Sequence, residues 1–261
     1  MKILVFVKQV PNTVDVKIDP QTGNICRDGV ESVLNPYDAN AIEAALRLKD
    51  SHGATVSVIS MGPPQAMDVL NYALGMGCDE CYLLSDRAFG GADTLATGYV
   101  LAKAAEKIGD YDLLLFGKCA TDAETAQTGP IVAEFAGVPQ VTLADSLSVE
   151  DGWAYCRRDL GNSYEDVKVK LPAMVAVTSS INTPRYPTAK GIMSRARKPH
   201  HVWDLNELGA DGERTGVKGS PSINKRIFEP PKHSTDTVFF NGSVQEMASA
   251  FVDVLEEAHL I

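Results

Sequence analysis

Apolar runs of strand length alternate with helical patterns over residues 1–180. The runs expected to form buried strands are residues 2–8, 55–61, 82–84, 112–116 and 174–178. Apolar residues at helical spacing predict helices that start after residue 36, span residues 63–76, start at residue 92 and span residues 124–136. Two or three further strands are expected in residues 140–170. This alternation predicts an α/β fold with a Rossmann-like, mostly parallel sheet and helices on both faces.

The pattern divides the chain into three segments. Residues 1–180 form the predicted α/β domain, residues 181–205 an extended loop, and residues 206–261 a linker and C-terminal arm. Within the first segment, Lys17-Ile18-Asp19 and Asn24-Ile25 flank turn residues and predict a hairpin.

The C-terminal arm is expected to end in an amphipathic helix. Ser243 stands three residues before Glu246, which is the spacing of a capping box. The apolar residues that follow lie on one helical face: Val244, Met247, Ala248, Phe251, Val254, Leu255 and Ala258. This stripe has to be buried, and a partner protein could cover it.

The chain is acidic, because 24 Lys and Arg against 34 Asp and Glu give a net charge of -10. Such a chain is a poor candidate for non-specific binding to nucleic acid or anionic membranes. No apolar stretch in the sequence approaches the roughly 20 residues that cross a bilayer, and the N-terminal apolar run is too short for a signal peptide. We therefore expect a cytoplasmic protein without nucleic-acid or membrane partners.

The chain has five cysteines, at positions 26, 78, 81, 119 and 156. Their number is odd and the sequence shows no secretion signal, which argues against a disulfide framework. Cys78 and Cys81 form a CxxC pair, so redox and metal roles have to be weighed. The sequence has no second CxxC, and its five histidines show no ligand spacing, so no metal site is predicted. Buried structural thiols are the favoured interpretation.

One segment stands out by its charge, because no Asp or Glu lies between Val167 and Trp203. The segment holds seven basic residues: Lys168, Lys170, Arg185, Lys190, Arg195, Arg197 and Lys198. In an acidic chain such a stretch indicates a docking surface for an acidic protein patch. A solvated loop of incidental charge is the alternative.

Several catalytic and cofactor signatures are absent from the sequence. There is no GxGxxG, GxxxxGKS/T, GxSxG or HExxH motif. Gly75-Met76-Gly77 stops short of a dinucleotide fingerprint, because Cys78 and Glu80 follow where the third glycine is due. The chain therefore lacks the residues of a hydrolase or a stand-alone dehydrogenase, and no catalytic side chain is predicted.

Polar and turn-forming residues follow three of the predicted strands. Lys8 and Gln9 end the first strand, Gly62 and Pro63 follow the second, and the loop of residues 117–130 follows the fourth. Open parallel sheets bind ligands at the carboxyl ends of their strands. The 117–130 loop offers a glycine, a lysine and hydroxyl groups near a helix start, which suit a phosphate. Ordinary polar helix caps are the alternative, but three such segments at one sheet edge favour a nucleotide site.

A set of motifs together resembles one protein family. The motifs are Val7-Lys8-Gln9-Val10-Pro11, Asn35-Pro36-Tyr37-Asp38, Met61-Gly62-Pro63, the 117–130 loop with Pro139-Gln140, and Pro184-Arg185-Tyr186 with Gly191-Ile192-Met193. In this order, over roughly the first 200 residues, they resemble the β subunit of electron-transfer flavoproteins. The resemblance implies an obligate heterodimer with an α subunit and electron exchange with a flavin-dependent dehydrogenase.

In that family the sheet-edge segments bind an adenine nucleotide. The resemblance assigns this role to Phe6, Val7, Lys8, Asn35, Pro36, Tyr37, Asp38, Met61, Gly62, Gly117, Lys118, Cys119, Ala120, Thr121, Asp122, Ala123, Glu124, Thr125, Ala126, Gln127, Thr128 and Gly129. It also makes residues 185–198 a recognition loop for the dehydrogenase, and the C-terminal arm a segment that wraps the α subunit. Residues 118–124 depart from the family's common sequence, which leaves the side-chain contacts at 119, 121, 123 and 124 open. Ala189 stands where aerobic relatives commonly carry an apolar anchor, which leaves the identity of the dehydrogenase open.

The family contains two types of β subunit. Aerobic members hold AMP, whereas bifurcating members from anaerobes hold a second FAD that NADH reduces. Residues 86–97 resemble the bifurcating type, which assigns NAD binding to Arg87, Phe89, Gly90, Gly91, Ala92, Asp93 and Thr94. A glycine pair that opens a helix suits a closely approached diphosphate. The less favoured alternative is that Asp93 is a plain acid at a helix start.

The favoured hypothesis is a bifurcating β subunit of anaerobic metabolism, with FAD as cofactor and NADH as substrate. One electron would go to a ferredoxin or flavodoxin, and the other through the α-subunit FAD to the dehydrogenase. The flavin carries the chemistry, so no acid or base side chain is required. The alternatives are an electron shuttle that holds structural AMP and a nucleotide-sensing module without a redox role.

Overall fold

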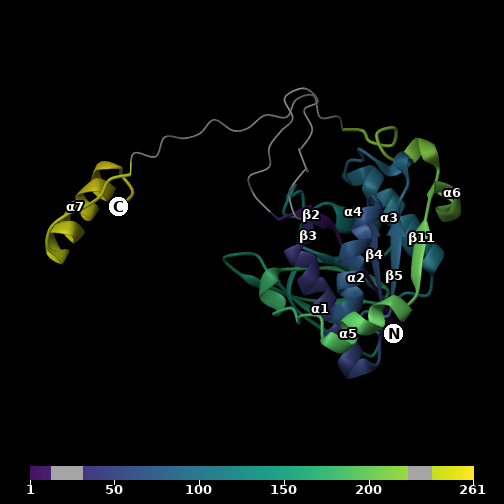
Figure 1. The fold of residues 1–261 in the computed structure, drawn as a ribbon. Coiled ribbons are helices and arrows are strands. Elements are labelled where there is room, and N and C mark those ends of the chain that lie inside the picture. The colour runs from purple at the N-terminus through teal and green to yellow at the C-terminus, as the bar shows by residue number, and fades with distance from the viewer. Residues whose placement is uncertain (13–31, 223–236) are drawn as a thin grey trace. The chain divides into compact units, whose positions relative to one another are not determined.

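The computed structural model describes residues 1–12, 32–222 and 237–261 (Figure 1). The chain divides into two compact units, Met1–Arg226 and Ile227–Ile261. The hairpin predicted around residues 17–25 lies outside the described residues, as does Cys26. Among the helices described, none is long and apolar enough to cross a membrane.

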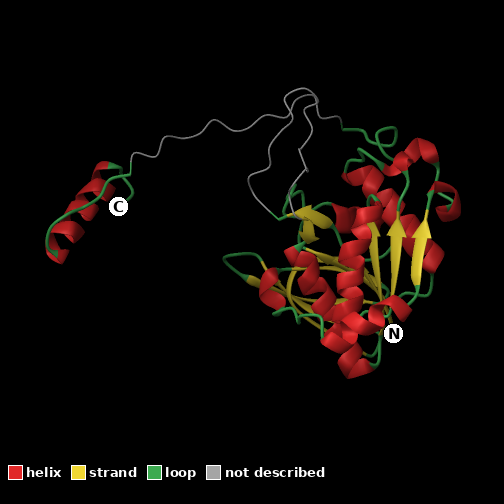
Figure 2. Ribbon diagram, viewed as in Figure 1, coloured by secondary structure: helices red, strands yellow, loops and turns green. Residues whose placement is uncertain are grey.

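A nine-stranded sheet forms the centre of the first unit (Figure 2). Its order is β11-β5-β4-β1-β6-β10-β7-β8-β9, and all pairings are parallel except β7 with β8 and β8 with β9. The α/β class and the mostly parallel sheet are thus confirmed. The strands are β1 (Lys2–Phe6), β4 (Thr55–Met61), β5 (Glu80–Leu84), β6 (Leu113–Gly117), β7 (Gln140–Glu150), β8 (Trp153–Asp159), β9 (Tyr164–Lys170), β10 (Ala173–Val177) and β11 (His200–Trp203).

Helices cover both faces of the sheet, as predicted. Successive strand residues point to opposite faces, and each set packs in its own hydrophobic core. Ile3 and Val5 of β1 lie in the first core, and Leu4 and Phe6 lie in the second. The helices of the first core are α1 (Pro36–His52) and α2 (Met67–Met76), and those of the second are α3 (Thr94–Ile108), α4 (Thr128–Ala136) and α6 (Leu205–Leu208).

The structure corrects two expectations about the end of the sheet. Residues 174–178 are the last strand that the sequence predicts and are therefore expected to end the sheet, but β10 lies inside it, between β6 and β7. The later strand β11 pairs in parallel with β5 and forms one edge. Its sequence is His-His-Val-Trp and it is partly exposed, so it carries no apolar-run signal. Residues 181–205, expected to be extended, thus contain a strand and also helix α5 (Ala189–Ser194).

Several element ends differ from the predictions by a few residues. β1 ends at Phe6, and Gln9–Pro11 (β2) then pairs antiparallel with Ser32–Leu34 (β3). The helix expected from residue 92 begins at Thr94, and the helix expected from residue 124 begins at Thr128. These shifts lengthen the loops at the carboxyl ends of the strands, where the predicted site lies.

The second unit contains the predicted terminal helix, α7 (Val244–Glu257). Its capping box is present, because the Ser243 hydroxyl accepts from the Glu246 N–H and the Glu246 carboxylate accepts from the Ser243 N–H at 2.7 Å. The apolar stripe is exposed within this unit, with Val244 at 78% and Phe251 at 51%. An exposed stripe of this kind is typical of a surface that another protein covers.

The CxxC pair lies in the first core. Cys78 and Cys81 are both fully buried. Burial raises the pKa of Cys78 to about 12 and that of Cys81 to about 11, so neither thiol forms a reactive thiolate near neutral pH. Within the described ranges, no group of three His, Cys, Asp or Glu side chains is placed to hold a metal ion. The burial of both thiols fits a structural role.

Candidate functional site

The predicted nucleotide-binding segments meet at the carboxyl edge of the sheet. The neighbouring strands β4, β1 and β6 end at Met61, Phe6 and Gly117. After β1 the chain adds β4 and β5 on one side, and then crosses to the other side with β6. The ends of β1 and β6 therefore border the topological switch point, where open parallel sheets bind ligands.

Phe6 and Phe116 join the two strands that border the switch point. Their rings stack with centroids 4.4 Å apart and planes 5° apart. Both side chains are buried, and so is Val7. The side chains of Phe6 and Val7, which the resemblance assigns to the nucleotide site, therefore lie in the core and not on the open surface of this edge.

The first turn of α1 is tied to the end of β1. The Asn35 N–H donates to the Lys8 carbonyl at 3.0 Å, and the Lys8 N–H donates to Asp38 Oδ2 at 2.8 Å. Burial raises the pKa of Asp38 from 3.8 to about 7, against the Asn35 amide and the N–H groups of Lys8 and Gly117, which lower it. The Asp38 carboxyl therefore changes its charge near neutral pH.

Asn35 ties the same turn of α1 to the loop that follows β6. Its side-chain N–H donates to the Cys119 carbonyl at 2.9 Å, and its Oδ1 accepts from the Thr121 N–H at 3.2 Å. Asn35 is fully buried, and hydrogen bonds in such surroundings are stronger than exposed ones. Its amide thus fixes the path of the loop.

Gly117 allows the loop to leave β6 close to α1. A Cβ on Gly117 would lie 2.5 Å from Asp38 Oδ1 and 2.6 Å from the carbonyl carbon of Tyr37. Any side chain would push the loop away from the helix. The glycine thus permits a close approach between two parts of the chain, the loop after β6 and the first turn of α1.

The rest of the loop is exposed and partly strained. Residues 121–127 are exposed, and Glu124 and Ala126 have φ values of 50° and 54°. Such left-handed residues cost about 1–2 kcal/mol each and are frequent in ligand-binding loops. Lys8 Nζ contacts both carboxylate oxygens of Asp122 at 2.7 Å, which ties the loop to the end of β1.

Helix α4 begins with backbone donors that no side chain of the described residues caps. The Ile131 N–H donates to the Gln127 carbonyl at 3.0 Å, so the N–H groups of Thr128 and Gly129 precede the helical ladder. The Gln127 side chain is used elsewhere, since its Oε1 accepts from the Thr94 hydroxyl at 2.9 Å. Backbone donors at a helix start suit a phosphate or diphosphate group.

Together these features suit the phosphate groups of a ligand. An exposed loop, an uncapped helix start and lysines at positions 8 and 118 lie at one strand edge. Met61 and Gly62 border this region at the end of β4, where the Gly62 N–H donates to the Leu84 carbonyl at 3.0 Å. The structure thus gathers at one edge the segments assigned to the nucleotide: residues 6–8, 35–38, 61–62 and 117–129.

The residues assigned to NAD follow β5 at the same edge of the sheet. Arg87–Phe89 form a 3-10 turn, and the Asp86 side chain caps it by accepting from the Ala88 N–H at 2.9 Å. Phe89 is buried in the second core. The Thr94 hydroxyl, through its bond to Gln127, links this turn to the nucleotide loop.

A later segment, residues 215–222, covers this turn. Gly91 has a φ of +70°, and a Cβ added there would lie 2.7 Å from Val217 Cγ2. Gly216 has a φ of +54°, and its Cβ would lie 2.2 Å from the Ala88 carbonyl oxygen. The space beside Gly91 is thus occupied by the chain itself. Sequence reasoning missed this contact, since nothing near Val217 indicates it.

Asp93 is also engaged by its own chain. Its Oδ1 accepts from the N–H groups of Leu95 and Ala96, each at 3.0 Å, so Asp93 caps α3. Its Oδ2 accepts from the N–H and hydroxyl of Ser222 at 3.1 and 2.8 Å. The interpretation as a helix-start acid therefore accounts for these contacts without a ligand.

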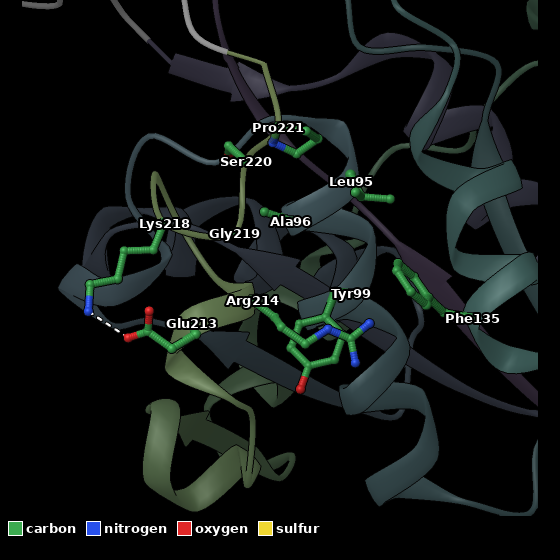
Figure 3. Close-up of a pocket in the computed structure, with 10 residues that line it drawn as sticks. All are labelled: Leu95, Ala96, Tyr99, Phe135, Glu213, Arg214, Lys218, Gly219, Ser220 and Pro221. Atoms are coloured by element: carbon green, nitrogen blue, oxygen red, sulfur yellow. Dashed lines mark hydrogen bonds and ion pairs between the residues drawn. The ribbon is translucent and has the colours of Figure 1, made fainter.

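The neighbouring residues 213–221 border a hollow against α3 and α4 (Figure 3). Its volume is about 350 Å³, and Leu95, Tyr99 and Phe135 provide its apolar side. The Arg214 guanidinium lies over the Tyr99 ring at 4.1 Å, and the Tyr99 and Phe135 rings meet edge to face with centroids 5.9 Å apart. The sequence indicated none of these contacts.

The acid-free segment uses part of its positive charge to bind α1 and α2. Arg185 pairs with the buried Glu43 at 2.8 Å, and Lys198 Nζ donates to two backbone carbonyls, of residues 74 and 78, at 2.8 and 2.5 Å. In the described part of the chain, Arg195 and Arg197 make no ion pair. Tyr186 is 84% and Met193 80% exposed in the same segment, which therefore presents both apolar and basic groups.

Comparisons with known proteins identify relatives over the whole length. The family model described as "Electron transfer flavoprotein domain" matches residues 22–208. The chain is 44% identical to "Caffeyl-CoA reductase-Etf complex subunit CarD" of Acetobacterium woodii, over 100% of both chains. It is 43% identical to "Electron transfer flavoprotein subunit beta" of Clostridium acetobutylicum, again over 100% of both. It is 36% identical to "Acryloyl-CoA reductase electron transfer subunit gamma" of Anaerotignum propionicum over 100% of both.

Proposed function

This chain belongs to the electron transfer flavoprotein family as a β subunit, and on that premise we propose that it takes part in electron bifurcation. In this role the chain would hold FAD, which would supply the acceptor for hydride from NADH. The electrons are divided between a ferredoxin or flavodoxin and the α-subunit FAD that serves a dehydrogenase. β subunits of this family partner with an α subunit, so the working form is the heterodimer.

The observation that carries the nucleotide site is the uncapped start of α4 beside the Gly117 loop. There the N–H groups of Thr128 and Gly129 would hold a diphosphate, with the Thr125 and Thr128 hydroxyls as further donors. Lys8 would add positive charge at the same edge. Bound FAD would supply a two-electron acceptor that can release single electrons. The chain's own residues bind and orient the cofactor.

The partner dehydrogenase is proposed to reduce a CoA thioester. Two relatives carry the names of caffeyl-CoA reductase and acryloyl-CoA reductase systems. The recognition loop would supply the docking surface, with Tyr186 and Met193 as apolar anchors in place of the missing anchor at Ala189. The stripe of α7 would be buried on the α subunit, since it is exposed within its own unit.

A second candidate is an electron shuttle that holds AMP. One observation favours it: the turn assigned to NAD is covered by residues 215–222, and Asp93 is engaged by Ser222. NADH would have to displace this contact to reach the turn. A shuttle that takes its electrons from a dehydrogenase has no need of such access.

Cofactor extraction from the purified heterodimer tests the proposal. A bifurcating protein should release two FAD and no AMP per heterodimer, and NADH should bleach the flavin absorbance. A shuttle should release one FAD and one AMP. One equivalent of AMP in the extract would overturn the bifurcating assignment.

Two glycine variants locate the nucleotide in this chain. Gly117→Ala places a Cβ 2.5 Å from Asp38 Oδ1, so it should remove the nucleotide of the β subunit and leave the α-subunit flavin. Gly212→Ala is the matched control, because its Cβ would meet Leu205 Cδ2 at an ordinary 3.4 Å. Equal cofactor content in the two variants would move the nucleotide site away from this loop.

A further inference from the structure

The first turn of α1 contacts the ends of both β1 and β6, which border the switch point. On the β1 side the Asp38 carboxyl accepts from the Lys8 N–H at 2.8 Å, and on the β6 side it lies against Gly117. We propose that Asp38 is a positioning residue: its buried carboxyl sets the spacing between the ends of β1 and β6, and its protonation tunes how firmly the nucleotide is held. The second half of this statement rests on the nucleotide site of the proposed function.

Apart from this turn and the Lys118 N–H, which donates to the Val177 carbonyl at 2.8 Å, the contacts of the loop with the rest of the described chain are exposed ones. Residues 121–127 are exposed, and the Lys8–Asp122 ion pair is open to solvent on its lysine side, with the lysine side chain 46% and the aspartate side chain 17% exposed. Exposed ion pairs contribute little to stability. The buried anchors are Asp38 at the start of the loop and Asn35 at Cys119 and Thr121. Of these two anchors only Asp38 can gain or lose a proton.

Few charged groups face Asp38 from the elements around it. Lys8, at the end of β1, favours the ionised carboxyl, but its ammonium also pairs with Asp122. From the loop, Cys119 has its pKa raised, mainly by burial and in small part by the charge of Asp38. Just before the start of α1, the neighbour is the neutral Asn35. The negative charge of an ionised Asp38 is thus only partly neutralised by a nearby cation.

This arrangement couples nucleotide binding to the protonation of the Asp38 carboxyl. A diphosphate at the start of α4 adds negative charge to the same strand edge, which disfavours the ionised carboxyl. By linkage, the protonated carboxyl then favours the bound nucleotide. Nucleotide affinity should therefore fall as the pH rises through 7, by at most about tenfold per pH unit.

The test uses the whole heterodimer, with FAD and AMP as probes. Wild type is compared with Asp38→Asn and Asp38→Ala, and Asp50→Asn, at the exposed end of the same helix, is the matched control. Retained nucleotide is measured after gel filtration at pH 6 and pH 8. Hydrogen exchange of residues 117–124 is compared between variants at each pH, with and without nucleotide.

We expect wild type and Asp50→Asn to lose nucleotide severalfold more at pH 8 than at pH 6, and Asp38→Asn to lose this dependence. Hydrogen exchange of residues 117–124 should be faster in Asp38→Ala than in wild type. The ratio of the exchange rate of this loop in Asp38→Asn to that in wild type should differ between pH 6 and pH 8. A wild-type pH profile in Asp38→Asn, or unchanged loop exchange in Asp38→Ala, would overturn the proposal.

Two further outcomes remain decisive. If Asp38→Ala does not fold, the pH profile of Asp38→Asn alone decides. If neither probe binds, the proposed function fails at this site, and the exchange ratio across pH 7 still decides whether Asp38 positions the loop.

Discussion

The backbones of Gly75 in α2 and Gly191 in α5 touch, since a Cβ on Gly191 would lie 2.1 Å from the carbonyl oxygen of Gly75. In the other direction, a Cβ on Gly75 would lie 3.1 Å from Pro187 Cβ. Gly75 belongs to the Gly-Met-Gly run that resembles an incomplete dinucleotide motif. Its use in the structure is to seat the recognition loop against α2.

We expect Gly191→Ala to displace α5 and to lower the free energy of unfolding by about 1–3 kcal/mol, as overpacked sites do. Chemical denaturation of the heterodimer measures the change. Gly212→Ala serves as the control, because its Cβ meets only an ordinary contact at 3.4 Å. Dehydrogenase affinity should fall in the first variant while flavin content stays unchanged. Equal stability of the two variants would contradict the close approach.

Asp38 should make stability depend on pH. Its pKa is raised from 3.8 to about 7 in the folded chain, so the folded state binds more protons than the unfolded state between these values. Stability from this group is therefore present at low pH and is lost as the pH rises from about 4 to 7, at most about 1.4 kcal/mol per pH unit. Relative to wild type, Asp38→Asn should gain stability from pH 5 to pH 8 in denaturant titrations. A constant difference would show that the carboxyl titrates normally.

Variants of Gly91 distinguish two explanations of its turn, which are the approach of NADH and packing against Val217. Gly91→Val should destabilise the chain, because the residue has a φ of +70° and its Cβ would lie 2.7 Å from Val217 Cγ2. Adding Val217→Ala removes the clash and should restore part of the stability. If NADH approaches this turn, flavin bleaching by NADH should stay lost in the double variant, while dithionite still reduces the flavins. Full recovery of NADH reduction would assign Gly91 to packing alone.

Two charge reversals in the recognition loop should distinguish a docking charge from a structural one. Arg197→Glu alters an exposed cation that makes no ion pair within the described residues, so folding should be unaffected. Dehydrogenase affinity at low salt should fall about threefold to tenfold, with a smaller effect at moderate salt. Arg185→Glu should instead lower the melting temperature, because it places a second carboxylate beside the buried Glu43 and leaves Arg47 as the remaining cation that pairs with it. Normal electron transfer by Arg197→Glu at low salt would contradict the docking role of this charge.

Local patterns predicted much of the fold. The alternation of apolar runs and helical spacing indicated the parallel strands and the helices on both faces, and the Ser243–Glu246 spacing indicated the cap of α7. Strand β11 was missed because its four residues carry no apolar run and its place depends on pairing with β5. Likewise the sequence indicated a phosphate-binding loop after β6, but not that the buried Asn35 and Asp38 fix it.

The sequence by itself determined which segments become strands and helices and which polar loops follow the strands, because periodicity and helix caps are properties of neighbouring residues. Only the tertiary structure decided that Val217 and Ser222 cover the turn of Gly91 and Asp93. It likewise decided that Arg185 binds Glu43, while Arg197 makes no ion pair with any residue that the structure describes. It also decided that Asp38 is buried against Gly117 and titrates near pH 7. These properties depend on burial and on contacts between residues far apart in the chain, which local patterns do not encode.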